Sequence, residues 1–207
     1  VKGCSPWALL PPLFSACVAV GLFVLYSSIA GNSPPASCVF SQIMNLGGFA
    51  GFVIAIFRYL QLKNTLYKPW LNAICLLAFS SACFGMTLIG NFQLFIEEEI
   101  HNFGTFLTFG LGTLFCWIQS YITLNILRFL LSVAITACFI LYSTLMSQDL
   151  HMHAARGQWA LVMFFLIFIG TFCVEFRHSR MVFLVTDNCR DPVGLTFTEM
   201  STDYSGT

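Results

Sequence analysis

Six long apolar segments, separated by short polar connections, fill most of this 207-residue chain. A helix needs about 20 predominantly apolar residues to cross the hydrocarbon layer of a bilayer, and each segment is close to that length. Charged residues make up only 9% of the chain, against roughly a quarter in a soluble domain. We therefore predict an all-α membrane protein, folded as a bundle of six transmembrane helices. The predicted spans are residues 7–29, 39–62, 70–89, 101–124, 126–146 and 158–174.

The basic residues predict how these spans are oriented. Lys and Arg near span ends are retained in the cytosol, and an N-terminus inside the cell places eight of the nine basic residues there. Both termini are then cytosolic, and only Arg156 is left outside. The outer face carries Glu97, Glu98, Glu99 and Asp149. The cytosolic set is Lys2, Arg58, Lys63, Lys68, Arg128, Arg177, Arg180 and Arg190.

Residues 1–180 are predicted to form one membrane domain, followed by a polar cytosolic tail at 181–207 with little structure. Two alternatives remain within this scheme. The first span also has features of a signal peptide, with Lys2 as its positive region and small residues at 28–31, although its apolar run is long for a signal core. Residues 120–130 contain neither Gly nor Pro, so either connecting residues are missing there, and near Tyr26, or spans four and five form an unusually tight hairpin.

Small residues in the spans are predicted to form helix-packing seams. Lipid tails provide no hydrophobic drive for helix association, so small residues allow close backbone approach and polar side chains bond across the interface. The functional alternative is that such seams let helices slide or open a path. The predicted seam residues are Gly47, Gly51, Gly104, Gly110 and Gly112.

Amides occur in or at the edges of the spans, where an unsatisfied polar group costs several kcal/mol. Gln42, Asn45, Asn72 and Gln119 must therefore bond to other helices, or line a polar route for ions if they converge. No acidic or basic residue occupies the centre of a span. Proton-coupled pumps and voltage sensors usually carry such charges, so neither class is favoured.

Three consecutive carboxylates, Glu97, Glu98 and Glu99, precede the fourth span on its predicted outer side. They are a candidate cation-attracting mouth of a pore, because adjacent carboxylates concentrate cations. The alternative is a solvated boundary whose charges favour the start of the next helix. The sequence contains none of the common zinc-protease, nucleophile-elbow or phosphate-loop motifs, and we predict no catalytic, cofactor or metal site.

Several short motifs in the chain resemble the DRAM/transmembrane-150 family, and look most similar to its tentonin branch. They cluster between residues 34 and 178, whereas the tail matches more weakly. The motifs are PPASCVFSQ (34–42), MN (44–45), RYLQLK (58–63), PWLN (69–72), FGMTL (84–88), GNFQL (90–94), EEIHN (98–102), CWIQ (116–119) and VEFRH (174–178).

The resemblance implies six spans with cytosolic termini, in agreement with the charge argument. It also implies a component or modulator of a mechanically activated cation channel in the plasma membrane, which is our leading expectation. The alternatives are a non-conducting scaffold for a channel or phosphoinositide-kinase complex, and an autophagy modulator in endolysosomal membranes. The expected partners are the lipid bilayer, cations, a channel or lipid-kinase protein and a second copy of the chain, with no nucleic acid and no catalytic positions.

Overall fold

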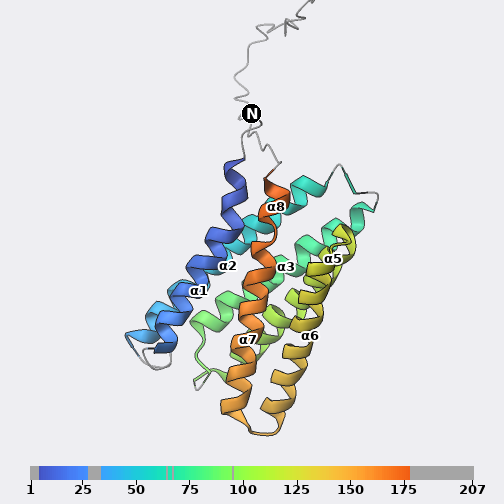
Figure 1. Cartoon of the computed structure of the whole chain (residues 1–207). Coiled ribbons are helices and arrows are strands. Elements are labelled where there is room, and N and C mark those ends of the chain that lie inside the picture. The colour runs from blue at the N-terminus through green and yellow to red at the C-terminus, as the bar shows by residue number, and fades with distance from the viewer. Residues whose placement is uncertain (1–4, 28–33, 64, 67, 95, 178–207) are drawn as a thin grey trace, which may run out of the picture.

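A computed structural model describes residues 5–27, 34–63, 65–66, 68–94 and 96–177, and within these ranges the chain is helical, without strands. Six helical segments are long and apolar enough to cross a membrane, so the predicted six-helix bundle is confirmed (Figure 1). The predicted tail at 181–207 lies outside the described residues. The elements are η1 (Pro6–Leu9), α1 (Leu10–Ser27), α2 (Ala36–Leu62), α3 (Pro69–Asn91), α4 (Glu98–Phe106), the π-helical turn η2 (Leu107–Leu111), α5 (Gly112–Thr123), α6 (Ile126–Ser147), α7 (His151–Gly170) and α8 (Cys173–Phe176).

Three of the spans are built from more than one element, and the first of them joins η1 to α1. The fourth span comprises α4, η2 and α5, and the sixth comprises α7 and α8. The sixth helix begins at His151, seven residues before the predicted start at 158. His151, His153 and Arg156 lower the hydropathy of this first part, yet nothing in their chemistry breaks a helix.

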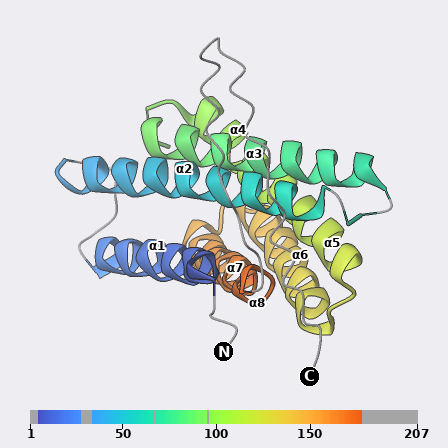
Figure 2. The ribbon, with the colours of Figure 1, turned by 90° about the horizontal axis from the view of Figure 1, so that it is seen from above.

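The six spans form a closed arrangement in which each packs against its neighbours in the sequence. In addition, α7 packs against α1, so the last span closes the ring of helices (Figure 2). Short connections favour such antiparallel neighbours. Large apolar side chains such as Phe23, Phe49 and Leu130 are exposed on the outside of the bundle, where lipid satisfies them.

The connection between α5 and α6 is a tight hairpin turn. Leu124 adopts the left-handed conformation, with φ of 48°, directly after α5 ends. The side-chain oxygen of Asn125 then accepts hydrogen bonds from the N–H groups of Leu127 (2.9 Å) and Arg128 (3.4 Å), which caps α6. The chain as given therefore makes the tight hairpin that was one of the two alternatives.

The helices run between two ends of the bundle (Figure 1), and the described charged residues lie at or near the helix ends. One end, which we call the basic end, carries Arg58, Lys63, Lys68, Arg128 and Arg177. It also holds the first and last described residues together, since the N–H of Ser5 donates to the carbonyl of Arg177 at 3.2 Å. The other end, the acidic end, carries the glutamates at 97–99 and Asp149. Lys2, Arg180 and Arg190 lie outside the described residues, and the sidedness of the bundle in the membrane remains a prediction.

Aromatic side chains fill the interior of the bundle toward the basic end. We call Phe79, Phe115, Phe168, Phe172 and Phe176 the phenylalanine plug. The Phe79 and Phe115 rings stack with centroids 4.2 Å apart, and Phe172 contacts both Phe115 and Phe168 edge to face at 5.9 Å. Each such aromatic pair stabilises the fold by about 0.5–1.5 kcal/mol, in addition to the contribution from burying its apolar surface. Phe79 at one side of the plug lines a cavity, and Phe172 at the other side lies against the guanidinium groups of Arg58 and Arg128.

Candidate functional site

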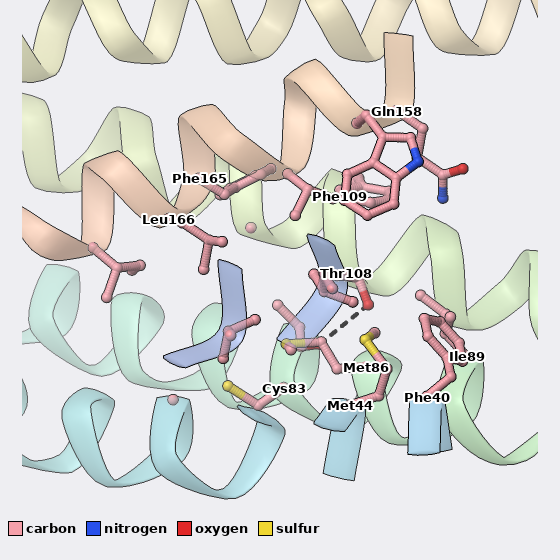
Figure 3. A pocket seen from close by; sticks show the side chains of 18 of the residues that line it. Phe40, Met44, Cys83, Met86, Ile89, Thr108, Phe109, Gln158, Phe165 and Leu166 are labelled. Carbon is pink, nitrogen blue, oxygen red and sulfur yellow. Dashed lines mark hydrogen bonds between the residues drawn. The ribbon is translucent and has the colours of Figure 1, made fainter. Parts of the chain in front are cut away.

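A cavity of about 410 Å³ lies inside the bundle, between α1, α2, α3, η2 and α7. This volume is within the range of roughly 300–1,000 Å³ that is typical of ligand pockets. Side chains from α7 face those from α2 and α3 across it (Figure 3). Its walls are almost entirely apolar and include Phe14, Val18, Leu22, Met44, Phe79, Met86, Ile89, Phe109, Val162, Phe165, Leu166 and Ile169.

The π-helical turn η2 shapes one wall of this cavity. Turns of this kind insert an extra residue into a helix and are frequent at functional sites. Here the turn presents Thr108 and Phe109 to the cavity. The hydroxyl of Thr108 donates to the carbonyl of Ala82 on α3 at 3.3 Å, which ties the turn to that helix (Figure 3).

Polar side chains gather where the cavity approaches the acidic end. Gln93, His101, Gln158 and Trp159 line this part, which we call the polar mouth. His101 is held in place because its Nδ1 donates to the carbonyl of Phe92 at 2.8 Å, a group that can only accept. The cavity therefore has a deep apolar part and a polar entrance.

The three glutamates lie beside this mouth. The N–H of Glu97 donates to the carbonyl of Gln93 at 3.0 Å, and the N–H of His101 donates to the carbonyl of Glu97 at 3.0 Å. The side chains of Glu97, Glu98 and Glu99 are exposed. They are absent from the cavity lining, so they contribute negative potential at the entrance rather than ligands inside it.

A buried ion pair lies on the other side of the phenylalanine plug. Nη1 and Nη2 of Arg128 approach the two carboxylate oxygens of Glu175 at 2.5 and 2.6 Å. The Nε of Arg128 also donates to the hydroxyl of Thr171 at 2.8 Å, and Nη1 reaches the hydroxyl of Thr123 at 3.5 Å. Parallel bonds of this kind are the strongest form of ion pair in proteins.

A second arginine joins the same cluster from α2. The Nε of Arg58 donates to Gln119 at 3.0 Å, and its Nη1 donates to Gln61 at 2.7 Å. Gln61 in turn donates to the backbone carbonyl of Glu175 at 2.9 Å. Arg58 and Arg128 also lie 5.3 and 4.4 Å from the ring of Phe172. We call Arg58, Gln61, Gln119, Arg128 and Glu175 the ionic cluster.

The four predicted amides do not come together in one place. Gln119 belongs to the ionic cluster, and Asn72, also toward the basic end, donates to the carbonyl of Tyr59 at 2.9 Å. Asn45 lies toward the acidic end and donates to Asn91 at 2.9 Å, across the contact between α2 and α3. Gln42 is exposed. Asn45, Asn72 and Gln119 thus form separate interhelical contacts at opposite ends.

Four of the five predicted seam glycines lie where helices approach closely. A Cβ added to Gly51 would lie 2.9 Å from Cys83 Sγ, one at Gly104 would lie 2.9 Å from Leu88 Cβ, and those at Gly47 and Gly112 would lie 3.2 and 3.1 Å from Met86 and Phe165. Gly110 instead has only Phe106, from the preceding turn, at 3.5 Å or more. The tightest approach among the described glycines is at Gly85, which is not one of the predicted seam residues. A Cβ at Gly85 would lie 2.6 Å from the carbonyl oxygen of Gly104.

Sequence reasoning missed the ionic cluster as a site. The places of Arg58 and Arg128 near span ends predict charges that set topology, yet the two residues are only 3% and 1% exposed. A local signal was present, because Arg58 and Gln61 are three residues apart and Gln119 and Thr123 are four apart, so each pair shares a helix face. Nothing in the sequence, however, indicates that these faces meet. Among the residues that the structure describes, no group of three or more His, Cys, Asp or Glu side chains could hold a metal ion.

Comparisons with known proteins identify the family. The Frag1/DRAM/Sfk1/Cwh43P N-terminal domain matches residues 12–179, which covers almost the whole described bundle. The modulator of macroautophagy TMEM150B from Danio rerio is 31% identical over 200 residues, covering 83% of this chain and 86% of the relative. The human protein of the same name is 29% identical, covering 73% and 70%, and transmembrane protein 150A from Xenopus laevis is 31% identical, covering 72% and 60%. No solved structure matches the chain. The chain therefore belongs to the Frag1/DRAM/Sfk1 family and is a multi-pass membrane protein.

Proposed function

We propose that this protein is a non-catalytic membrane regulator of macroautophagy. The observation that carries the proposal is the extent of the likeness: relatives named as modulators of macroautophagy align with 83% of the chain, and the family domain spans the helical bundle. The regulator would act in an endolysosomal membrane or in the plasma membrane, with its basic end toward the cytosol. Lys63 and Lys68, which are exposed in the connection between α2 and α3, would then face anionic lipid or a partner protein.

The interior of the bundle supports a regulator over a cation pore within a single chain. A path along the bundle axis from the cavity would have to cross the phenylalanine plug and then pass Arg58 and Arg128. The described cluster holds two guanidinium groups and one carboxylate, and all three are largely removed from water. Like charges repel strongly in such a low-dielectric environment, so this end of the interior opposes the passage of cations.

Autophagic flux in cells that lack the chain tests this proposal. Flux would be measured as turnover of a lipidated autophagosome marker, with and without a lysosomal inhibitor. Loss of the chain should change the flux, and re-expression should restore it. The double variant K63Q/K68Q should insert normally but restore it poorly, whereas R156Q, a charge removal near the acidic end, should restore it fully. Unchanged flux in cells verified to lack the chain would reject the regulatory function.

The second candidate is a component or modulator of a mechanically activated cation channel in the plasma membrane. One observation favours it: Glu97, Glu98 and Glu99 are exposed beside the polar mouth, where they would concentrate cations. A pore would have to form between chains or after rearrangement of the plug. Alternatively, the chain would act as a scaffold that alters another channel or a phosphoinositide-kinase complex.

Patches from liposomes that contain the purified chain distinguish these forms. A pore-forming chain should pass cations under suction, and the triple variant E97Q/E98Q/E99Q should lower the single-channel conductance. The control K68Q, which removes an exposed charge at the opposite end, should leave the conductance unchanged. Silent patches with verified insertion would reject the pore. Currents that change only when a mechanosensitive channel is co-reconstituted would identify a modulator.

A further inference from the structure

We infer that the cavity is a lipid site, which takes one acyl chain of a zwitterionic phospholipid from the leaflet at the acidic end. This inference goes beyond the proposed regulatory function and does not depend on it. It rests on three properties of the cavity: its depth, the division between its apolar and polar parts, and the charge at its mouth.

The depth of the cavity corresponds to one leaflet. Gln158 at the mouth and Ile169 at the inner end both line it and are eleven positions apart on α7. At 1.5 Å per residue this is about 16 Å. The hydrocarbon core of a bilayer is about 30 Å thick, so one leaflet is about 15 Å deep. A cavity that begins at the acidic end and stops at Phe79, in the phenylalanine plug, thus has the length of the hydrocarbon in one leaflet.

The lining suits hydrocarbon along most of this length. Phe14, Val18, Met86 and Leu166 present only carbon and sulfur to the interior. Methionine is flexible and polarisable, and it adapts to irregular apolar partners. The cavity has a volume of about 410 Å³ and is open on one side, so a ligand can enter it. Water is a poor occupant of so apolar a space, because each molecule needs two to four polar partners.

The mouth supplies what a lipid head group requires. Gln93, His101 and Gln158 provide polar groups where the chain would join its ester region. Just outside, the three exposed glutamates place negative charge close to Gln93 and His101, since the backbone of Glu97 bonds to the backbone of both residues. This potential attracts the distal ammonium of a choline or ethanolamine head and repels a head with net negative charge. A zwitterionic phospholipid therefore fits better than an anionic one.

The test uses the full chain reconstituted in vesicles of phosphatidylcholine with a minority of phosphatidylserine. A phosphatidylcholine probe with a photoreactive diazirine near the end of one acyl chain is activated, and labelled residues are located by mass spectrometry. Labels should concentrate on cavity-lining residues such as Met86 and Leu166, and excess lysophosphatidylcholine should reduce them at least fivefold. Labels confined to outward-facing residues such as Leu130 and Ile140, without competition, would overturn the inference.

Variants that fill the cavity give a second, independent readout. V18F on α1 and V162F on α7 each add an aromatic ring to the lining, and each should reduce cavity labelling at least fivefold. The matched controls are V20F on α1 and V133F on α6, which make the same change on exposed surface and should label like the native chain. The competition experiment on the native chain decides the question even if a filling variant fails to fold. Equal cavity labelling in filling variants that fold and in their controls would count against the site.

The identity of the head group is tested with matched probes. The phosphatidylserine form of the probe should label the cavity several-fold less than the phosphatidylcholine form, and E97Q/E98Q/E99Q should reduce that difference. K68Q removes an exposed charge at the opposite end and should leave the difference unchanged. Stronger labelling by the phosphatidylserine form, or saturable labelling of the same residues by a photoreactive sterol but not by either phospholipid, would refute the assignment to a zwitterionic phospholipid.

Discussion

Arg128 at the start of α6 and Glu175 in α8 are joined by two parallel contacts of 2.5 and 2.6 Å. Arg128 is 1% exposed and Glu175 is 23% exposed, so the two partners differ in their access to water. The guanidinium of Arg128 also lies 4.4 Å from the ring of Phe172, which couples the ion pair to the phenylalanine plug. The pair therefore ties the last described helix to the hairpin between α5 and α6.

The difference in exposure predicts unequal effects of breaking this pair. E175Q should lower the free energy of unfolding by about 3 kcal/mol, at the lower limit for a broken buried pair, because it leaves Arg128 buried with a neutral partner. R128Q should lower the free energy of unfolding by less, because the carboxylate of Glu175 would keep some contact with water. Reversible unfolding of the purified protein in mixed micelles measures both. E98Q, at an exposed position, should change the stability by less than about 0.5 kcal/mol. Equal costs for E175Q and R128Q would contradict this account.

The contact between Gly85 on α3 and Gly104 on α4 predicts a strong effect of one methyl group. A Cβ at Gly85 would lie 2.6 Å from the Gly104 carbonyl oxygen and 2.8 Å from the N–H nitrogen of Thr108, and backbone atoms cannot easily move away. G85A should therefore destabilise the bundle by about 1–3 kcal/mol, as overpacking does. G110A is the matched control, because its nearest neighbour is a side chain at 3.5 Å. A thermal unfolding series should place G85A well below G110A, and similar melting temperatures would be inconsistent with the close approach.

The left-handed conformation of Leu124 predicts a stabilising substitution. This conformation costs a residue with a side chain roughly 1–2 kcal/mol, and glycine adopts it freely. Because Leu124 is 85% exposed, its replacement removes little packing. L124G should raise the stability by up to about 1 kcal/mol. L130G, at an exposed position one turn into α6, should instead lower the stability by about 1 kcal/mol, since glycine is unfavourable inside a helix. Changes of the same sign in both variants would show that the turn geometry is not the cause.

The bond between Gln119 and Arg58 predicts that a neutral substitution will destabilise the core. Gln119 is fully buried and accepts the Nε–H of Arg58, so Q119L leaves a charged donor without that acceptor. We expect the free energy of unfolding to fall by about 1–3 kcal/mol, which is the cost of leaving a buried polar group without a partner. Q42L makes the same change at an exposed amide and should be neutral. If Q119L were as stable as Q42L, Arg58 would have to find a new acceptor.

The predicted sidedness of the bundle can be tested with glycosylation tags. A flexible linker that carries an Asn-X-Thr sequon, inserted after Asp149 between α6 and α7, should be glycosylated, because this connection is at the acidic end. The same linker inserted after Thr65, between α2 and α3 at the basic end, should remain unmodified. A shift in electrophoretic mobility that is reversed by a glycosidase reports each result. The opposite pattern would place the basic end outside the cytosol.

Hydropathy and charge predicted the parts of the fold that depend on local composition. Apolar segments of membrane-spanning length specify helices wherever they lie, and Asn125 caps α6 through bonds to residues two and three positions away. The boundary at His151 was missed because polar residues at a membrane surface lower hydropathy without ending a helix. Likewise, Gly47 and Gly51 were predictable as close contacts from their spacing alone, whereas Gly85 was not, because its tight contact comes from Gly104 and Thr108 on another span.

The sequence by itself determined the class of the protein, the number of its spans and the separation of its charges, because each of these follows from the chemistry of short segments in a bilayer. Only the tertiary structure decided what those segments enclose. Arg58 and Arg128 lie in one buried cluster with Glu175 because α2, α6 and α8 meet at one end of the bundle. The cavity exists for a related reason: α1, α7 and the turn at η2 pack around α3 without filling the space near Met86, and such a space depends on how complete helices fit together.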